Sequence, residues 1–198
     1  MKKYCSLFLL LAINFYFSQQ TEGLKRIKEK YDTQIQEIKN KYAEDSLKVS
    51  SRKLAKVTLK KNDDIYNLNA QRNNEYLEEA AKIKAAYKPS EKQSGSKSKS
   101  DNETSAKHLD GAESFKKEIS DNMYTYGISL KGKVESRVSF AIEKDGSITF
   151  VNAKGNNEKF NKQAELAVLL TQKKWEPATR DHEPVVSYMG FPISLNFD

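Results

Sequence analysis

The residues from Glu22 to Tyr87 contain no proline, and no glycine after Gly23, so nothing in this stretch strongly opposes a long helix. Ser50-Ser51 and Asn62-Asp63-Asp64 are its natural break points or caps. Apolar residues recur at helical spacing in two stripes, which comprise Leu24, Ile27, Tyr31, Ile35, Ile38 and Tyr42, and then Tyr76, Ala80, Ile83 and Tyr87. The pattern predicts two or three helices over residues 19–88, folded as a hairpin or extended as a coiled coil.

These stripes are too narrow for a globular core. They favour a charged spacer or an oligomerising coil, so a homo-oligomer held together by the helical region is one expectation. The alternative is an amphipathic surface that docks on lipid or cell wall. Its alternating charges argue against strong lipid insertion.

The chain begins MKKYCSLFLLLAINFYFSQQ, with two lysines, an apolar run from Leu7 to Phe17 and a polar exit. This layout is typical of a secretory signal peptide, and we expect residues 1–18 to be removed near Ser18. The apolar run is shorter than the ~20 residues that cross a bilayer, and it contains Asn14. The expected location is therefore the periplasm, or the membrane if the signal is retained as an anchor.

Cysteine and charge restrict the chemistry further. Cys5 is the only cysteine and precedes the apolar run, so the mature chain would have no disulfide and no cysteine metal site. Without Lys2 and Lys3 the formal charge falls from +7 to +5. On an exported protein, this modest excess favours anionic envelope surfaces or acidic partners over nucleic acid.

Residues 89–109 are rich in Ser and Lys and poor in apolar side chains, which predicts a flexible linker with a solvated His108. The pattern changes in residues 110–198. Phe115, Ile119 and Met123 share one face of a short helix, and two alternating strands follow around Asp145-Gly146. A three-residue loop with a left-handed Gly146 would pair Ile142 with Ile148 and Phe140 with Phe150, which gives one clean apolar face.

A second helix is predicted from FNKQAELAVLLTQKKW, with Asn161 as its N-cap and an apolar surface over residues 166–170. We expect Trp175 to end this helix as an aromatic plug and Pro177 to stop it from continuing. Residues 191–197 alternate as a final strand, and Pro192 predicts that this strand lies at a sheet edge. The fold class is α+β: a small sandwich in the order helix, strand, strand, helix, strand, with an antiparallel sheet, helices on one face and an N-terminal helical segment.

No sequence pattern points to catalysis. His182 lies between two acids in a loop, which is too little for a metal site or acid-base pair, and the known catalytic motifs are missing from the sequence. We therefore expect a protein that is not an enzyme, with no catalytic residues, no metal and no cofactor.

Three stretches in this order and spacing resemble the C-terminal domain of the TonB family: VSFAIEKDGSITFVNA, FNKQAELAVLLTQKKWEPA and EPVVSYMGFPISLNF. The resemblance covers residues 109–198 and implies a domain that binds an extended segment of an outer-membrane transporter, or of another envelope protein, by strand addition. By position it implies that Val186, Ser187, Tyr188, Met189 and Gly190 contact the partner. Proline at Ser187 or Tyr188 would then abolish binding without unfolding the domain.

The chain departs from the family in its N-terminal half. A helical segment and a Ser/Lys linker stand where a transducer has a membrane helix and a proline-rich spacer. The main expectation is an exported binding module, which the resemblance links to transmembrane transport through the outer membrane. The alternatives are a membrane-anchored energy transducer and a structural coiled-coil envelope protein.

Overall fold

The computed structural model describes the backbone of residues 2–87, 102–125, 132–171 and 175–197. The chain divides into two compact units, Met1–Glu79 and Ala80–Asp198. Together they contain long helices and small antiparallel sheets, which confirms the α+β class.

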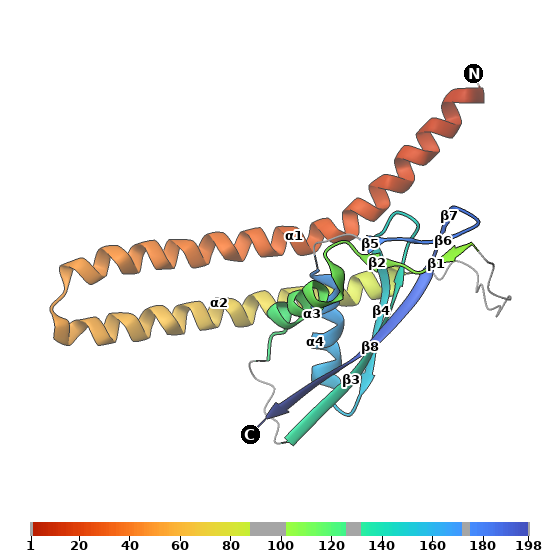
Figure 1. The fold of residues 1–198 in the computed structure, drawn as a ribbon. Helices are drawn as coiled ribbons and strands as arrows, with labels where there is room; N and C mark the ends of the chain where they lie inside the picture. Colours follow the sequence, from red (N-terminus) through yellow and green to blue (C-terminus); the bar gives the residue numbers. More distant parts are fainter. Residues whose placement is uncertain (1, 88–101, 126–131, 172–174, 198) are drawn as a thin grey trace. The chain divides into compact units, whose positions relative to one another are not determined.

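The first unit is a helical hairpin made by α1 (Lys2–Lys48) and α2 (Ser51–Ala86), the latter extending beyond the unit (Figure 1). The chain reverses at Ser50, whose carbonyl accepts hydrogen bonds from the N–H groups of Lys53 and Leu54. The predicted break at Ser50-Ser51 is therefore confirmed. The break at Asn62-Asp63-Asp64 is wrong, because α2 runs through it: a few poor helix formers cost only tenths of a kcal/mol each, and packing on α1 outweighs that.

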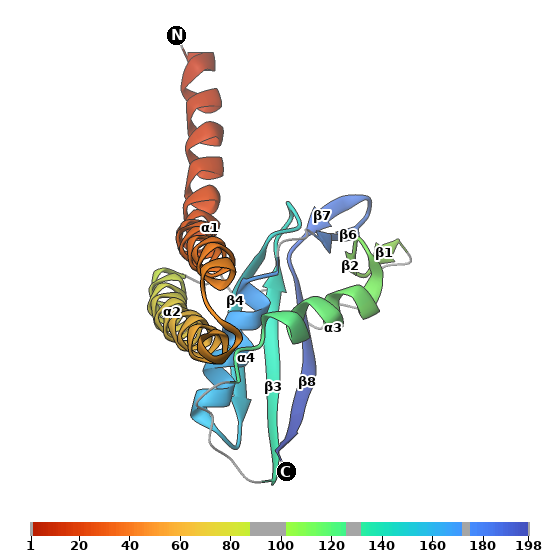
Figure 2. The same ribbon diagram turned by 90° about the vertical axis from the view of Figure 1, so that its left-hand side faces the viewer.

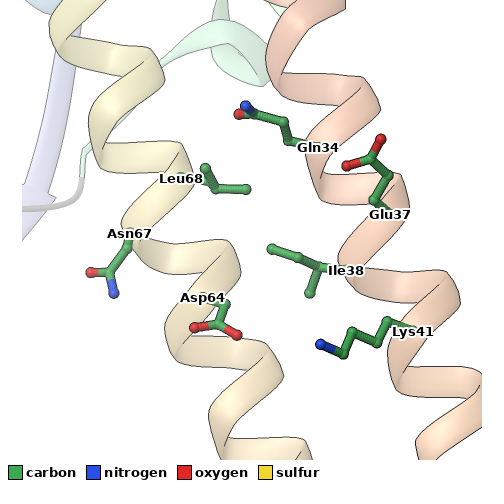
Figure 3. Close-up of a pocket in the computed structure, with 7 residues that line it drawn as sticks. All are labelled: Gln34, Glu37, Ile38, Lys41, Asp64, Asn67 and Leu68. Carbon is green, nitrogen blue, oxygen red and sulfur yellow. The ribbon is translucent and has the colours of Figure 1, made fainter.

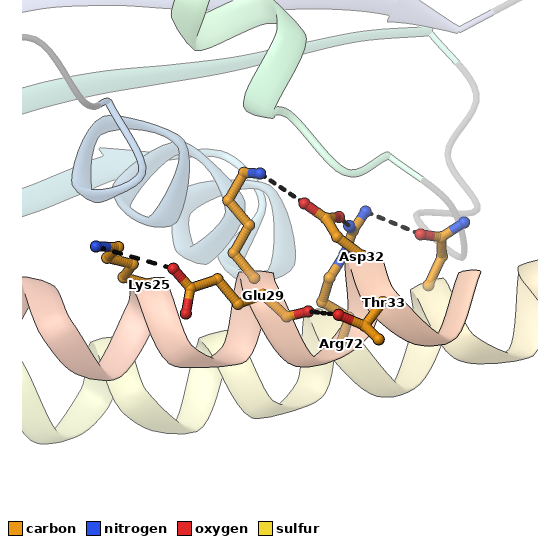
Figure 4. A network of polar contacts seen from close by, with 7 residues as sticks. Lys25, Glu29, Asp32, Thr33 and Arg72 are labelled. Carbon is orange, nitrogen blue, oxygen red and sulfur yellow. Dashed lines mark hydrogen bonds and ion pairs between the residues drawn. The ribbon is translucent and has the colours of Figure 1, made fainter. Parts of the chain in front are cut away.

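Polar contacts connect the two helices along their length. Tyr31 is 2% exposed, and its hydroxyl donates to Glu75 Oε1 at 2.8 Å, as does Lys30 Nζ at 2.6 Å. Arg72 Nη1 on α2 donates to Asp32 Oδ1 on α1 at 3.1 Å (Figure 4). Exposed pairs each contribute only ~0–1 kcal/mol, so most of the hairpin's stability comes from the apolar stripe, in which Leu24, Tyr31 and Tyr76 are buried and the other members are partly buried.

We expect the stability of this hairpin to depend on the charge of Glu75. Hydrogen bonds from Lys30 and then Tyr31 hold the pKa of Glu75 below its ordinary value of 4.5. A lowered folded-state pKa adds stability that is present above the ordinary pKa and lost as the pH falls through the folded-state pKa. Glu75→Gln should therefore lower the melting temperature at neutral pH, and the difference from wild type should shrink as the pH falls below 4.5 and through the lowered folded-state pKa of Glu75. Thermal denaturation by circular dichroism tests this, and a difference independent of pH would contradict it.

The second unit is built on a three-stranded antiparallel sheet in the order β4-β3-β8 (Figure 2). Its elements follow the predicted order: α3 (Gly111–Asn122), β3 (Gly132–Ile142), β4 (Ile148–Gly155), α4 (Glu158–Leu169) and β8 (Ser187–Phe197). Five short strands form two smaller sheets, β1-β6-β7 and β2-β5: β1 (Glu103–Thr104), β2 (Lys107–His108), β5 (Trp175–Glu176), β6 (Ala178–Arg180) and β7 (Glu183–Val185). The last residues of α2, from Ala80, also belong to this unit.

The core lies between the sheet and the pair α3 and α4, which pack together on one sheet face (Figure 1). Phe140 in the central strand is fully buried. The Phe115 ring from α3 lies 5.8 Å from the Phe140 ring, and the Trp175 ring lies 5.7 Å from it, all distances between centroids. Trp175 is thus the aromatic plug that the sequence predicts.

The hairpin between β3 and β4 has the predicted loop. Glu143 N–H donates to the Ser147 carbonyl, Gly146 N–H donates to the Glu143 carbonyl, and Gly146 has φ +79°. Ile142 pairs with Ile148 as expected. The predicted pairing of Phe140 with Phe150 is wrong, because a bulge with φ +48° at Phe150 shifts the register by one residue.

Glycine is required at position 146 because of its left-handed backbone and because of a close contact with Trp175. At Gly111 only the first of these reasons applies, so the two glycines can be compared. A Cβ at Gly146 would lie 2.0 Å from the Trp175 carbonyl oxygen, whereas one at Gly111, with φ +83°, would meet no atom within 4 Å. Gly111→Ala should cost about 1–2 kcal/mol from the left-handed backbone alone. Gly146→Ala should cost clearly more, because the Trp175 backbone must also move. Chemical denaturation of the two variants measures the difference, and equal losses would contradict the close-contact argument.

Three local predictions need correction. His108 is not solvated: it is 5% exposed, in β2, with its ring 5.3 Å from each of the Phe115 and Trp175 rings. The N-cap of α4 is Asn157, whose side chain accepts from Phe160 N–H at 2.9 Å, and not Asn161. Most of the predicted 89–109 linker lies outside the described residues, but residues 102–109 contribute β1 and β2.

The proposed helix exit is also different. Helix α4 ends at Leu169, where the Thr171 hydroxyl donates to the Val168 carbonyl and satisfies a terminal acceptor. Trp175 therefore does not end the helix but lies in β5, and half-buried Pro177 stands between β5 and β6. Trp175 reaches the core because its backbone is paired: its N–H donates to the Gly146 carbonyl, and it stands opposite His108.

Candidate partner-binding edge

Strand β8 lies at one end of the β4-β3-β8 sheet and pairs with β3 along its whole length. No other strand of the described residues pairs with its second side, so β8 is the edge strand that Pro192 predicts. An edge of this kind presents a row of N–H and C=O groups to an incoming strand.

The backbone direction of β8 can be derived residue by residue. Directly after β3, Glu143 N–H donates to the Ser147 carbonyl on the β4 side of the hairpin loop, and within β3 the Glu135 carbonyl accepts from Asn156 N–H just after β4. Odd-numbered residues of β3 therefore direct their backbone groups towards β4. Even-numbered residues of β3 then face β8, where each stands opposite an odd-numbered residue. The backbone groups of the even-numbered residues of β8 therefore point away from the sheet.

This alternation separates the five residues that the resemblance implies. Tyr188 and Gly190 direct their N–H and C=O groups to the open edge, whereas Ser187 and Met189 stand opposite Ile142 and Phe140 and face β3. Val186 precedes the strand and is half-buried. Among the described residues, no acceptor meets the outward N–H groups of Tyr188 and Gly190.

Pro192 is the next outward position and has no N–H to offer. It stands opposite Arg137, and the ladder continues beyond it to Gly132 and Phe197. The outward row of donors is therefore interrupted at Pro192, and Tyr188 and Gly190 form a short separate docking segment.

The far edge of the sheet, along β4, is occupied by a side chain. Ala153 stands opposite Val138, so its N–H points outward, and it donates to Glu165 Oε1 of α4 at 2.8 Å. Lys84, at the end of α2, donates to the same carboxylate at 2.7 Å and to Asn152 Oδ1 at 3.3 Å. The two edges differ: β4 is protected here, and β8 is open at Tyr188 and Gly190.

An aromatic cluster lies on the sheet face opposite α3 and α4. The Phe150 ring is 6.4 Å from the Tyr188 ring in an edge-to-face arrangement and 5.2 Å from the Tyr87 ring. Burial raises the pKa of Tyr87, and the neighbouring Tyr188 raises it further. Tyr188 is 62% and Phe150 is 41% exposed, so both rings have area left to contact a ligand.

Sequence reasoning missed Tyr87 and Phe150 as members of this site. Tyr87 belongs to the helical stripe in the sequence, and only the fold brings it to the sheet. Phe150 has the same strand phase as Ile148, so the alternation predicts that it faces the core. The bulge instead turns its side chain to the other face of the sheet.

The described residues contain no cluster of three or more metal-ligating side chains, and His182 is exposed in a turn. A groove of about 470 Å³ between the helices of the first unit has a mixed lining (Figure 3), comprising Gln34, Glu37, Ile38, Lys41, Asp64, Asn67 and Leu68.

Comparison with protein-family models, curated proteins and solved structures finds no match to this chain. In the part of the chain that the structure describes, no helix carries an apolar stretch long enough to cross a bilayer.

Proposed function

We propose that this protein is an exported, non-enzymatic binding module that captures an extended segment of an envelope protein by strand addition to β8. The observation that carries the proposal is the pair of outward backbone groups at Tyr188 and Gly190, which no strand or side chain of the described residues occupies. An extended peptide satisfies such groups with its own N–H and C=O groups.

The docking segment is short, and this limits the affinity that backbone hydrogen bonds can give for a peptide. Each backbone hydrogen bond contributes only about 1 kcal/mol net, and Pro192 limits how many form. Further affinity has to come from side chains beside the edge, and exposed Tyr188, Met189 and Phe150 provide that area. We expect a weak, reversible complex that prefers a partner with an apolar or aromatic residue next to its pairing segment.

The partner class follows from the resemblance to the TonB family: a periplasmic segment of an outer-membrane transporter, or of another envelope protein. The proposal places the protein in the periplasm after signal cleavage near Ser18. A retained N-terminus would favour the membrane-anchored energy transducer instead. Mass spectrometry of the protein isolated from its host distinguishes the two, since cleavage predicts a chain that starts near Gln19 or Gln20.

Amide hydrogen exchange tests the binding mode residue by residue. In the free protein, the amides of Tyr188 and Gly190 should exchange quickly, and those of Met189 and Phe191 slowly, because only the latter pair with β3. A synthetic peptide with the sequence of a periplasmic segment of a TonB-dependent transporter should slow exchange at Tyr188 and Gly190 specifically. A scrambled peptide is the control. If the transporter peptide binds and leaves both amides fast, strand addition at β8 is wrong.

A further inference from the structure

The turn of the helical hairpin has a charge distribution unlike the rest of the first unit. Residues 46–62 contain six basic side chains and no acidic one, whereas acids flank them at Glu44-Asp45 and Asp63-Asp64. The basic residues are Lys48, Arg52, Lys53, Lys56, Lys60 and Lys61. This segment, the hairpin tip, is thus a concentrated positive charge at the end of a helical pair of mixed charge.

Most of these cations are available to an external partner. Lys61 lies over the Tyr42 ring, 4.3 Å from its centroid. The other five are exposed, and none of them is in an ion pair within the described part of the chain. Farther along the hairpin the pattern differs, since Lys28 and Lys30 each pair with an acid at 2.6 Å.

The same tip exposes large apolar side chains. Leu47 is 88% exposed at the end of α1, Leu59 is 63% exposed, and Leu54 is 36% exposed in the first turn of α2. Hairpin packing does not account for Leu47 and Leu59, because contact with the other helix would bury them. Single exposed leucines are common on protein surfaces and need no explanation. Three of them beside cations that form no ion pairs indicate an interaction surface.

From this combination we infer that the hairpin tip docks on a bilayer that contains anionic phospholipid. Basic side chains next to leucines are the composition of protein segments that bind at membrane interfaces: the cations attract the headgroups and the apolar side chains enter the acyl boundary. Leu47 and Leu54, closest to the turn, would enter first, with Lys48, Arg52 and Lys53 at headgroup level.

The charges argue against the other occupants. A second copy of the tip would bring like charges together, which opposes self-association through this surface. A nucleic acid would gain from the cations but not from exposed leucines, since phosphate contacts depend on charge. Of these three occupants, only a bilayer uses both the cations and the exposed leucines. This inference is independent of peptide capture at β8, because it rests on residues of the first unit alone.

Vesicle binding of the full chain tests the inference. The probes are vesicles of phosphatidylcholine alone and of phosphatidylcholine with phosphatidylglycerol. The apolar N-terminal run would bind both, so the readout is the extra affinity for the anionic vesicles. Wild type should show this preference. Lys53→Glu with Lys56→Glu should remove it, with a loss of at least about twentyfold, since each basic residue near an anionic surface contributes about fivefold.

Two further variants distinguish a bilayer-docking surface from a surface that attracts anions through charge alone. Leu47→Ser with Leu59→Ser should weaken binding to anionic vesicles by about fivefold or more, because the apolar contact is lost. Lys144→Glu with Lys154→Glu makes the same charge change at exposed sites of the second unit and should leave the tip's contribution intact. All three variants change exposed side chains, and circular dichroism should show unaltered helix content.

The outcomes are distinct. Full anionic binding by the leucine variant would overturn the inference and leave a general polyanion site, as would binding of duplex DNA that exceeds vesicle binding. An equal loss in the Lys144/Lys154 control would show that net charge, and not the tip, is responsible. Loss in both tip variants, with the control unchanged, supports bilayer docking.

Discussion

Replacing Trp175 by alanine is expected to destabilise the second unit by about 3–5 kcal/mol, which is a large part of the stability of a typical domain. The indole is 6% exposed, and its ring lies 4.9 Å from the Phe115 ring and 5.7 Å from the Phe140 ring. It fills the space between α3 and the sheet, so its removal leaves a cavity that the surrounding strands cannot close.

Hydrogen exchange at the Phe140 amide is the appropriate measurement, because circular dichroism is dominated by the helical hairpin. Trp175→Phe is the matched control. Among the described residues, the Trp175 Nε1 is buried without an acceptor, so phenylalanine removes an unpaired donor and keeps much of the ring. Phe150→Ala, at a partly exposed ring, should also cost less. A Trp175→Ala loss no larger than that of Phe150→Ala would mean that the indole is not part of the core.

Local sequence signals predicted the parts of the sheet that local chemistry determines. Gly146 fixes the hairpin loop because only glycine readily adopts the left-handed conformation that the turn needs. Pro192 fixes the open edge, because its missing N–H is tolerated only where no strand pairs. In both cases a single residue determines the backbone, so the prediction needed no tertiary information.

The errors have tertiary causes. His108 lies in a Ser/Lys-rich stretch whose composition predicts exposure to solvent. In the folded chain, however, the rings of Phe115 and Trp175 pack against it. The bulge at Phe150 brings its ring to Tyr87 and Tyr188, which are distant in sequence. The alternation of apolar and polar residues within β4 does not indicate this bulge. The places of Phe150 and Tyr87 in the candidate site were therefore not predictable from the sequence, whereas the edge strand and Tyr188 on it were.

Replacing Tyr188 by proline is expected to weaken peptide binding by about tenfold to a hundredfold while leaving the sheet folded. Its N–H points to the open edge, so the change removes no bond to β3, and the pyrrolidine ring blocks the partner strand. The partner carbonyl is then left unsatisfied, at a cost of about 1–3 kcal/mol. Pro192, already present on the same edge, is precedent that the strand tolerates proline at an outward position.

Ser187→Pro is the informative contrast and corrects the sequence-based expectation that either proline is harmless to the fold. Ser187 stands opposite Ile142 with its backbone directed at β3, so proline there should destabilise the sheet itself. Tyr188→Ala separates the ring from the backbone, since it removes the aromatic contact to Phe150 and keeps the N–H. Calorimetry with the transporter peptide compares the two Tyr188 variants, and the weaker binding is expected for Tyr188→Pro. If Tyr188→Pro binds as tightly as Tyr188→Ala, the partner uses the aromatic face and not the β8 backbone.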